Sequence, residues 1–380
     1  MQNTDKMIKV LEVKTKKQIK QFVDFPIKLY KDCPYFVPPL YGDEMAMFKK
    51  NYHYYEQAES IFFNAYDEND KMVGRIQAIL QKASNEKWNQ KRVRFTRFDS
   101  IDDQEVANAL FKAVEDWAKS KQMEEVVGPL GFSDLEREGL LIEGFNEMST
   151  FEEQYNYDYY QKLIEHNGYQ KEIDWVERQL RAPKEKDERY EKISQMMIKK
   201  YNLHYGEAKD VNEFLKKYAS GFFDILDITY DKLYGTVPFT ESMKKNLISS
   251  FKLIVKVENV EVIVDENERI VAFALGFPSL SNALSGTNGK LTPKTLLKLL
   301  KAINKPKSID LGLIGVLPEY ANKGISSAFI AVIMDWLCSG KYEYAETNLN
   351  LEDNISVQNQ WKAFDSRLHK RRRSFIKKIN

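Results

Sequence analysis

The sequence predicts an α/β protein built from two similar domains in succession, each with a mixed central sheet flanked by helices. Three observations support this expectation: the length of the chain, a hairpin that occurs twice and a helix that occurs twice. A chain of 380 residues suits two cores of about 150 to 200 residues each. Hydrophobic residues make up 43% and aromatic residues 13% of the chain, which is enough apolar material for both cores.

The repeated hairpin is the first sign of a duplication. Residues 67–73 have the sequence DENDKMV, and residues 265–271, which begin 198 positions later, have the sequence DENERIV. Each acidic segment lies between two runs of strand character, as in a hairpin turn. The recurrence indicates two copies of one strand-turn-strand unit.

A repeated helix follows each hairpin. Residues 111–117 resemble residues 329–336, and each run lies in a segment with apolar residues at helical spacing. Asn156 and Asn354 are also 198 positions apart. Three matches in the same order favour a duplicated α/β unit.

The joint between the copies is expected near residue 185. Residues 181–187 are polar, contain a proline and separate a strand-like run from a new helical pattern. The sequence therefore predicts one domain over residues 1–184 and a second over residues 185–380.

An insertion distinguishes the second domain. Residues 276–305 contain a loop rich in Ser, Asn and Gly and then a helix, with Thr292 as its N-cap and Pro293 in its first turn. Inserted loops of this kind often shape a substrate pocket.

The composition predicts no charged macromolecular partner. Lys and Arg number 57 and Asp and Glu number 56, so no overall field favours nucleic acid or a membrane surface. The four His residues are scattered, and Cys33 and Cys338 are far apart, so we expect neither a metal site nor a disulfide. Residues 1–20 are polar, and no apolar run of about 18 residues occurs. We therefore expect a cytoplasmic protein without a nucleic-acid, membrane or metal partner.

The second domain contains a segment with the chemistry of an anion site. Residues 308–316 read as a buried strand, residues 317–327 as a loop, and an amphipathic helix follows. Gly324 lets the backbone approach a ligand closely, and Ser326 and Ser327 are small. The amides at the start of the helix can form a nest for an anion, aided by the helix dipole. A pyrophosphate would fit there.

This segment resembles the acetyl-CoA motif of the GNAT acyltransferase superfamily. In that motif a valine-rich strand, a Pro-Glu-Tyr turn and a glycine-containing loop open a helix. The matching residues are Val316, Pro318, Glu319, Tyr320, Lys323, Gly324 and Ile325. Ala321 stands where the family usually has Arg or Gln, and Ser326 stands where it has Gly or Ala. The resemblance implies two tandem GNAT-like domains, each with a mostly antiparallel sheet, a splayed parallel pair of strands and flanking helices.

A second part of the resemblance lies downstream. Asn354, Val357 and Trp361 have the spacing of the family's Asn-x-x-Ala-x-x-x-Tyr helix. In the family the Asn contacts the coenzyme arm, and the Tyr commonly protonates the departing thiolate. Trp361 cannot do this because an indole N–H is not a useful acid at neutral pH. The proton donor is therefore missing or supplied from elsewhere.

The N-terminal domain is similar in outline but lacks the phosphate loop. Asn156, Gly168 and Tyr169 resemble the family's Asn…Gly-Phe segment. Residues 99–103, in the place of the loop, carry three carboxylates and no glycine. Charge repulsion argues against a coenzyme there, so this half is expected to be a degenerate copy that supports the acceptor side.

The resemblance also implies which residues hold the coenzyme. The backbone amides of residues 314–316 would hold the pantetheine arm and the thioester carbonyl, and residues 322–327 would hold the pyrophosphate. The expected coenzyme contacts are Ile314, Gly315, Val316, Asn322, Lys323, Gly324, Ile325, Ser326, Ser327 and Asn354.

Two carboxylates are candidates for the catalytic base. Asp310 lies on the strand that precedes the loop, and Glu346 lies on the neighbouring strand. Each also has a structural interpretation: Asp310 can bond a neighbouring loop, and Glu346 can form an ion pair. Residues 369–373 are basic, but Phe375 and Ile376 favour a terminal strand with a solvated basic face over a nucleic-acid tail.

The predicted function is acyl-CoA dependent N-acyltransfer, with acetyl-CoA or coenzyme A as co-substrate and a small-molecule or peptidyl amine as acceptor. Catalysis would rest on positioning, polarisation of the thioester carbonyl and removal of an ammonium proton. One alternative is a binding protein that keeps the fold without the chemistry. Another is a transferase for an aminoacyl or long acyl donor. The acceptor and the oligomeric state stay open.

Overall fold

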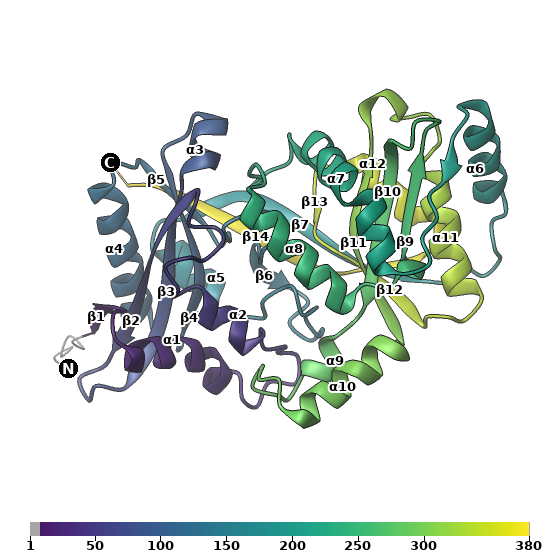
Figure 1. Cartoon of the computed structure of the whole chain (residues 1–380). Coiled ribbons are helices and arrows are strands. Elements are labelled where there is room, and N and C mark those ends of the chain that lie inside the picture. The colour runs from purple at the N-terminus through teal and green to yellow at the C-terminus, as the bar shows by residue number, and fades with distance from the viewer. Residues whose placement is uncertain (1–7, 380) are drawn as a thin grey trace. The chain divides into compact units, whose positions relative to one another are not determined.

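The computed structural model describes residues 8–379, which fall into two compact units (Figure 1). Unit 1 contains residues 8–175, 281–298 and 370–379. Unit 2 contains residues 176–280 and 299–369. No helix in the described part of the chain is both long and apolar enough to cross a membrane.

The units exchange short segments, so they do not follow a single cut near residue 185. Residues 375–378 pair with residues 125–128 and complete the sheet of unit 1. Residues 179 and 180, from the end of the first half, pair with residues 345 and 346 in unit 2. Each sheet therefore includes a strand segment from the other half of the sequence.

The sheet of unit 1 has the strand order β1-β2-β3-β4-β5-β14, in which β4 and β5 are parallel. Its strands are β1 (Lys9–Glu12), β2 (Ala58–Tyr66), β3 (Met72–Gln81), β4 (Arg92–Ser100), β5 (Glu125–Gly128), β6 (Leu140–Glu143), which pairs with β14, and the C-terminal part of β14 (Asp365–Lys378). Its helices are α1 (Lys16–Leu29), α2 (Tyr41–Ala46), α3 (Lys82–Trp88), α4 (Gln104–Ser120), α5 (Tyr159–His166) and α9 (Ser281–Leu284). The core forms between this sheet and the apolar face of α4, which includes Val106, Leu110 and Phe111.

The sheet of unit 2 has the strand order β7-β12-β11-β10-β9-β8. Its strands are β7 (Gln170–Arg181), β8 (His204–Tyr205), β9 (Val260–Val264), β10 (Ile270–Pro278), β11 (Ser308–Val316), β12 (Tyr344–Thr347) and β13 (Asn350–Leu351), which pairs with β7. Its helices are α6 (Arg189–Lys200), α7 (Val211–Tyr230), α8 (Glu241–Ile254), α11 (Ser327–Cys338) and α12 (Ile355–Gln360), with 3-10 turns η1 (Val257–Asn259), η2 (Pro318–Tyr320) and η3 (Trp361–Ala363). Helix α10 (Pro293–Asn304) begins in a segment of unit 1 and ends in one of unit 2.

The repeated hairpin is present in both units with the same turn. Asp67 Oδ1 accepts hydrogen bonds from the amides of Asn69 (3.0 Å) and Lys71 (2.9 Å). Asp265 Oδ1 accepts the corresponding bonds from the amides of Asn267 (2.9 Å) and Arg269 (3.0 Å). These side-chain bonds explain why the acidic sequence recurs: the Asp supplies an acceptor that closes the turn.

The predicted terminal strand is confirmed as β14, but the prediction of a solvated basic face is wrong. Lys370 and Arg372 are fully buried. The Lys370 ammonium donates to the Met148 carbonyl at 3.1 Å, and the Arg373 guanidinium donates to both carboxylate oxygens of Asp174 at 2.7 and 2.9 Å. These cations are hydrogen-bonded inside unit 1, and Arg373 is also neutralised by Asp174.

Candidate functional site

Two parallel strands of unit 2 separate at the centre of its sheet. Strands β11 and β12 pair from Ser308 and Tyr344 to Leu311 and Thr347. The Asn348 amide donates to the Leu311 carbonyl at 3.1 Å. Strand β12 ends at Thr347, while β11 continues to Val316 alongside β10. Beyond Leu311, the edge of β11 that faces β12 is therefore not covered by that strand.

A β-bulge in β11 decides which side chains face which side of the sheet. Leu313 pairs with Leu275 but Leu311 pairs with Gly276, so Gly312 is an extra residue. A Cβ on Gly312 would lie 2.9 Å from the Phe277 ring, which explains the glycine. The bulge places Leu311 and Ile314 on the side that carries α11, and Asp310 and Leu313 on the opposite side. The polar and apolar surfaces of the site are separated in this way.

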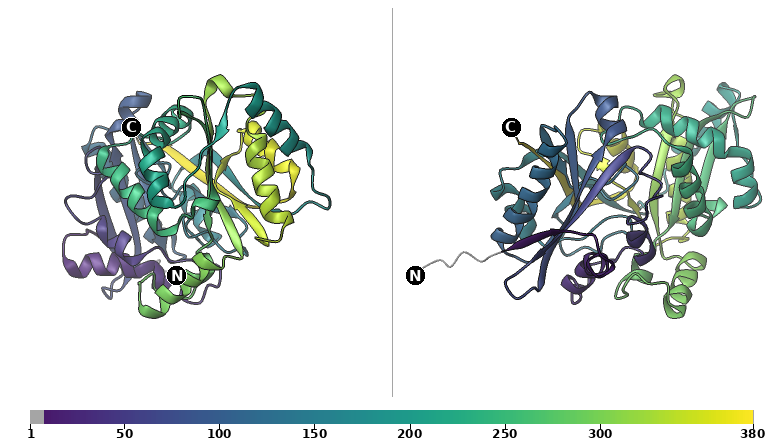
Figure 2. Two further views of the ribbon diagram at one scale, coloured as in Figure 1. Left: turned by 45° about the vertical axis from the view of Figure 1, so that its right-hand side comes forward. Right: turned by 60° about the vertical axis from the view of Figure 1, so that its left-hand side comes forward.

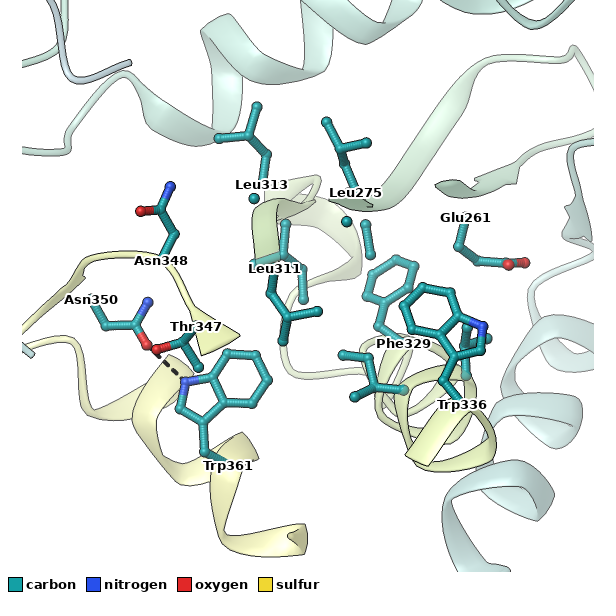
Figure 3. A pocket seen from close by; sticks show the side chains of 16 residues that line it. Glu261, Leu275, Leu311, Leu313, Phe329, Trp336, Thr347, Asn348, Asn350 and Trp361 are labelled. Atoms are coloured by element: carbon teal, nitrogen blue, oxygen red, sulfur yellow. Dashed lines mark hydrogen bonds between the residues drawn. The ribbon is translucent and has the colours of Figure 1, made fainter. Parts of the chain in front are cut away.

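An apolar pocket lies at this separation, mainly on the α11 side (Figure 3). The space around it, counting its open mouth, is about 520 Å³. In Figure 3 the rings of Trp361, Phe329 and Trp336 lie on one side of β11, while Leu275 and Leu313 extend to the other. The wall contributed by α11 consists of Phe329, Val332, Ile333 and Trp336. This lining suits a hydrocarbon chain rather than a polar ligand.

One carboxyl group lines the pocket among these apolar residues. Glu261, on β9, pairs with Ala274 on β10, and both lie on the α11 side with Ile314. Burial disfavours the charged form and raises the pKa of Glu261 to about 7. At neutral pH a large part of this carboxyl group is therefore uncharged.

Trp361, which stands at the Tyr position of the motif that the sequence resembles, forms part of the pocket wall. Its side chain is buried, and its indole N–H donates to Asn350 Oδ1 at 2.8 Å (Figure 3). Asn354 is the N-cap of α12, because its Oδ1 accepts from the Val357 amide at 3.3 Å. Asn354 is not among the residues that line the pocket, whereas Asn348 and Asn350 are.

A hydroxyl group that the sequence did not reveal lies at the open edge of β11. Tyr230, the last residue of α7, accepts a hydrogen bond from the Ile314 amide at 3.2 Å. The same hydroxyl group donates to the Ile314 carbonyl at 3.1 Å. The Ile314 backbone, an expected contact of the coenzyme, thus points away from β10 and meets Tyr230. A tyrosine in a helix that precedes the motif by about eighty residues carries no local sequence signal.

The loop after β11 has the backbone of an anion site. Asn322 and Gly324 have positive φ angles of 60° and 77°. Within residues 8–379 no acceptor bonds the amides of Asn322, Gly324, Ile325 and Ser326, whereas those of Lys323 and Ser327 bond within the loop. The Lys323 ammonium lies 5.0 Å from the centre of the Tyr201 ring. The loop therefore offers several N–H groups and one cation to a ligand.

The two predicted base candidates lie side by side on the face opposite α11. Asp310 and Glu346 are register partners in the parallel pair β11 and β12, and Glu346 is also paired with Gln179 on β7. Asp310 is 4% exposed, so its carboxyl group is inside the protein. The structure brings both carboxylates to the edge of the strand separation.

Two further residues join these carboxylates. Glu177 and His369 are buried, and His369 Nε2 lies 3.7 Å from Glu346 Oε2. One ligand atom each from Glu177, Glu346 and His369 lie within 4.8 Å of one another, and in residues 8–379 this is the group that could hold a metal ion. Carboxylate and imidazole ligands suit Zn²⁺. Because the three residues are far apart in sequence, no spacing indicated the cluster.

The corresponding place in unit 1 is filled by the chain's own side chains. Asp103 is the N-cap of α4, and its carboxylate accepts from the Glu105 amide at 3.0 Å. Asp99 accepts from Arg75 Nε at 2.7 Å and from the Tyr30 hydroxyl group at 3.1 Å. A carboxylate at the helix start takes the position that an anionic ligand would need.

The chain is similar over nearly its whole length to Protein YghO of Escherichia coli (strain K12). The two are 27% identical over 379 residues, which cover 96% of this chain and 94% of that protein. The chain is also 26% identical over 327 residues to the bacterial ceramide synthase of Caulobacter vibrioides (strain NA1000 / CB15N), covering 84% of this chain and 83% of that protein. No family model matches the chain.

Solved structures with low sequence identity share the architecture. A tandem GNAT protein from the clavulanic acid biosynthesis pathway has a TM-score of 0.56 at 9% identity and covers 98% of this chain and 99% of that chain. A GCN5-related glucosamine N-acetyltransferase region of a fungal multi-domain GH3 β-N-acetylglucosaminidase has a TM-score of 0.56 at 11% identity and covers 99% of this chain and 38% of that chain. With a parallel strand pair in each unit, the chain has the tandem GNAT fold that the sequence predicted.

Proposed function

We propose that unit 2 binds an acyl-CoA and transfers the acyl group directly to an amine. The observation that carries this proposal is the order of the surfaces along β11 and the loop that follows it. The strand separation and the apolar pocket lie beside residues 311–314, and the loop with open amides follows at residues 322–326. A thioester with an apolar acyl end and an anionic pyrophosphate end matches that order of surfaces.

The reaction needs one proton acceptor on the acceptor side. The amine nitrogen attacks the thioester carbonyl carbon, a C–N bond forms, and the C–S bond breaks. The nitrogen loses a proton to a carboxylate, and Asp310 or Glu346 provides one at the strand separation. Because both lie on the face opposite α11, the amine is expected to approach from that face while the acyl chain lies on the other.

The departing thiolate takes up a proton, and Tyr230 is the better donor. The Trp361 N–H is bonded to Asn350 in the pocket wall and is not acidic. The Tyr230 hydroxyl group lies at the Ile314 backbone, on the edge of β11. When a thioester occupies this edge, its carbonyl oxygen can replace Tyr230 on the Ile314 amide, which leaves the hydroxyl group near the sulfur.

A long acyl donor is favoured over acetyl-CoA by the apolar lining of the pocket. The α11 wall contributes two aromatic and two branched aliphatic side chains, more apolar surface than a methyl group needs. One relative is named a bacterial ceramide synthase, and a ceramide is a fatty acid amide. We therefore place the donor among long-chain acyl thioesters, with an amine as the acceptor.

The test is release of free thiol from acetyl-, octanoyl- and palmitoyl-CoA with a panel of amines. A Val332→Trp substitution fills the α11 side of the pocket, and Cys338→Trp, an exposed position on the same helix, is the matched control. We expect Val332→Trp to lower kcat/KM for palmitoyl-CoA by about tenfold or more and to affect acetyl-CoA less. Cys338→Trp should behave as wild type.

Two results would count against this account. Equal losses for acetyl- and palmitoyl-CoA in Val332→Trp would show that the pocket does not hold the chain. A folded protein that binds coenzyme A but releases no thiol with any donor or amine would favour the binding-only alternative.

A further inference from the structure

Helix α10 has an unusual arrangement of side chains for the surface of a protein. It is the light green helix beside α9 in Figure 1, and Figure 2 shows it from two further directions. Thr295 is buried and Leu299 and Ile303 are half-buried, so this side faces the protein. A second side carries three exposed leucines. Their exposed fractions are 43% for Leu296, 69% for Leu297 and 55% for Leu300.

A row of lysines borders the exposed leucines. On a helical wheel, Lys294, Lys298 and Lys301 lie next to the leucine stripe, between it and the side of Thr295. All three lysines are exposed, and no residue in the described part of the chain forms an ion pair with them. Residues 285–309 contain six lysines and no Asp or Glu. Helix α10 therefore has three sides: one is apolar and exposed, one carries the lysines, and one packs against the protein.

The start of α10 is held firmly, so these faces have a defined direction relative to unit 1. Thr292 caps the helix, because its Oγ1 accepts from the Thr295 amide at 3.2 Å. The Gly289 carbonyl accepts from the Tyr41 amide at 2.9 Å. The Lys290 ammonium lies 4.6 Å from the centre of the Tyr41 ring. Leu291, which precedes the cap, is a further exposed apolar residue at this end (54%).

We propose that α10 binds the surface of an anionic lipid bilayer, lying in its plane. Leucines on one face of such a helix enter the boundary between headgroups and acyl chains, and lysines along the edge contact anionic headgroups. The long lysine side chains can extend along the helix so that the ammonium groups reach the phosphates. Each of the three faces of α10 then has a partner suited to it: protein, acyl chains and headgroups.

Charge favours a bilayer over a second copy of this chain. If two α10 helices packed through their leucines, the rows of Lys294, Lys298 and Lys301 would be brought close together and would repel. An anionic lipid surface supplies the opposite charge over the same area. The inference does not depend on the proposed acyltransfer, because it concerns binding to lipid alone.

The experiment is co-sedimentation of the full chain with vesicles of phosphatidylcholine, with and without phosphatidylglycerol. Leu297→Ser removes the most exposed leucine, and Lys298→Glu reverses one charge of the row. Met196→Ser and Lys199→Glu on α6, also a basic helix with an exposed apolar residue, are the matched controls. Light scattering reports the oligomeric state of each protein without lipid.

We expect wild type to sediment with the phosphatidylglycerol vesicles and to bind pure phosphatidylcholine at least about tenfold more weakly. Binding should weaken as the salt is raised from about 0.1 to 1 M, because the Debye length falls from about 10 to 3 Å. Leu297→Ser and Lys298→Glu should each weaken binding about tenfold, and the α6 controls should not.

Three results would overturn the inference. One is no binding of the wild-type protein to anionic vesicles. Another is binding that the α10 and α6 variants weaken equally. The third is a dimer in solution that Leu297→Ser dissociates, which would assign the leucine stripe to a second copy of the chain.

Discussion

At the scale of single residues, the departures from the family pattern have physical consequences in the pocket. Trp361 gives up the hydroxyl group of the usual Tyr and adds a large apolar surface, fixed by its bond to Asn350. Tyr230 on α7 supplies a hydroxyl group at the backbone of Ile314, a residue that lines the pocket. Glu261 adds a carboxyl group whose charge depends on pH near neutrality. Because of Glu261, the pocket is uncharged at low pH and carries a negative charge at high pH.

Glu261 makes a prediction for the stability of the protein. The pKa of Glu261 is about 7 in the folded protein, whereas the ordinary value for a Glu side chain is 4.5. The folded state therefore binds this proton more tightly than the unfolded state does. The resulting stabilisation is fully present below pH about 4.5 and is lost as the pH rises through about 7. Glu261→Gln should match wild type at about pH 4.5 and be more stable by roughly 1 to 2 kcal/mol at about pH 8.

The measurement is urea unfolding of both proteins at the two pH values. Glu258→Gln is the control, because Glu258 is exposed and lies in η1, directly before β9. Its free energy of unfolding should differ from that of wild type by the same amount at both pH values. The same Glu261→Gln variant should bind palmitoyl-CoA with an affinity that no longer falls between about pH 6 and 8. An unchanged pH dependence would show that Glu261 is not the titrating group.

At the scale of elements, β11 was predicted well as a strand and less well in its detail. The apolar run and the following loop indicated strand, turn and helix, as the structure has them. The bulge at Gly312 had one available signal, a glycine inside a strand pattern, which indicates a bulge or a close approach. Its consequence, that Leu311 and Ile314 share one face of the sheet, follows only from the pairing with β10.

For helix α10, the sequence predicted the start of the helix but not which of its faces is exposed. Thr292 and Pro293 correctly predicted where it begins. The leucines at 296, 297 and 300 were readable as an apolar stripe, but a stripe alone does not say whether it packs inside or stays exposed. The nearly equal numbers of acidic and basic residues in the whole chain also hid the six lysines of this segment.

The register of β11 and β12 makes a prediction for catalysis. Asp310→Asn or Glu346→Gln should lower kcat by about a hundredfold or more with little change in KM for the acyl-CoA, because a proton acceptor is lost. The loss should shrink as the pH is raised, since more of the free amine is then already deprotonated. Steady-state thiol release from about pH 6 to 10 measures both effects.

Treatment with a chelator distinguishes a catalytic base at Asp310 or Glu346 from a metal site that includes Glu346. With a carboxylate as the base, activity should survive prolonged treatment with EDTA. Activity that EDTA removes and Zn²⁺ restores would instead make Glu177, Glu346 and His369 a metal centre. Wild-type kcat in both carboxylate variants would exclude Asp310 and Glu346 as the base.

At the scale of the whole molecule, the internal repeat predicted the tandem fold, which is confirmed. The exchange of segments between the units was out of reach of the sequence. Pairing of residues 375–378 with residues 125–128 joins segments about 250 positions apart, and strand pairing at such a distance has no local signature. The buried cations of β14 were misjudged for the same reason, because Asp174 and the carbonyls that bond them are distant in sequence.

The two units also differ in what they can bind. Unit 2 has a loop with open amides after β11, whereas unit 1 has the Asp103 cap at the start of α4. A chain of this design should therefore bind one coenzyme rather than two. The stoichiometry of binding reports on the whole molecule and does not depend on the acceptor.

The most direct test is calorimetric titration of the full chain with coenzyme A, beside Gly324→Glu and Gly340→Glu. Both glycines have similar positive φ angles, 77° and 74°, so both substitutions impose similar backbone strain. Gly324 lies in the loop, whereas Gly340 follows α11 and has no atom within 4 Å of an added Cβ. We expect one site per chain in wild type and Gly340→Glu, and binding weakened at least about a hundredfold in Gly324→Glu. Two sites per chain, no binding by folded wild type, or equal binding by both variants would contradict the placement of the coenzyme in unit 2.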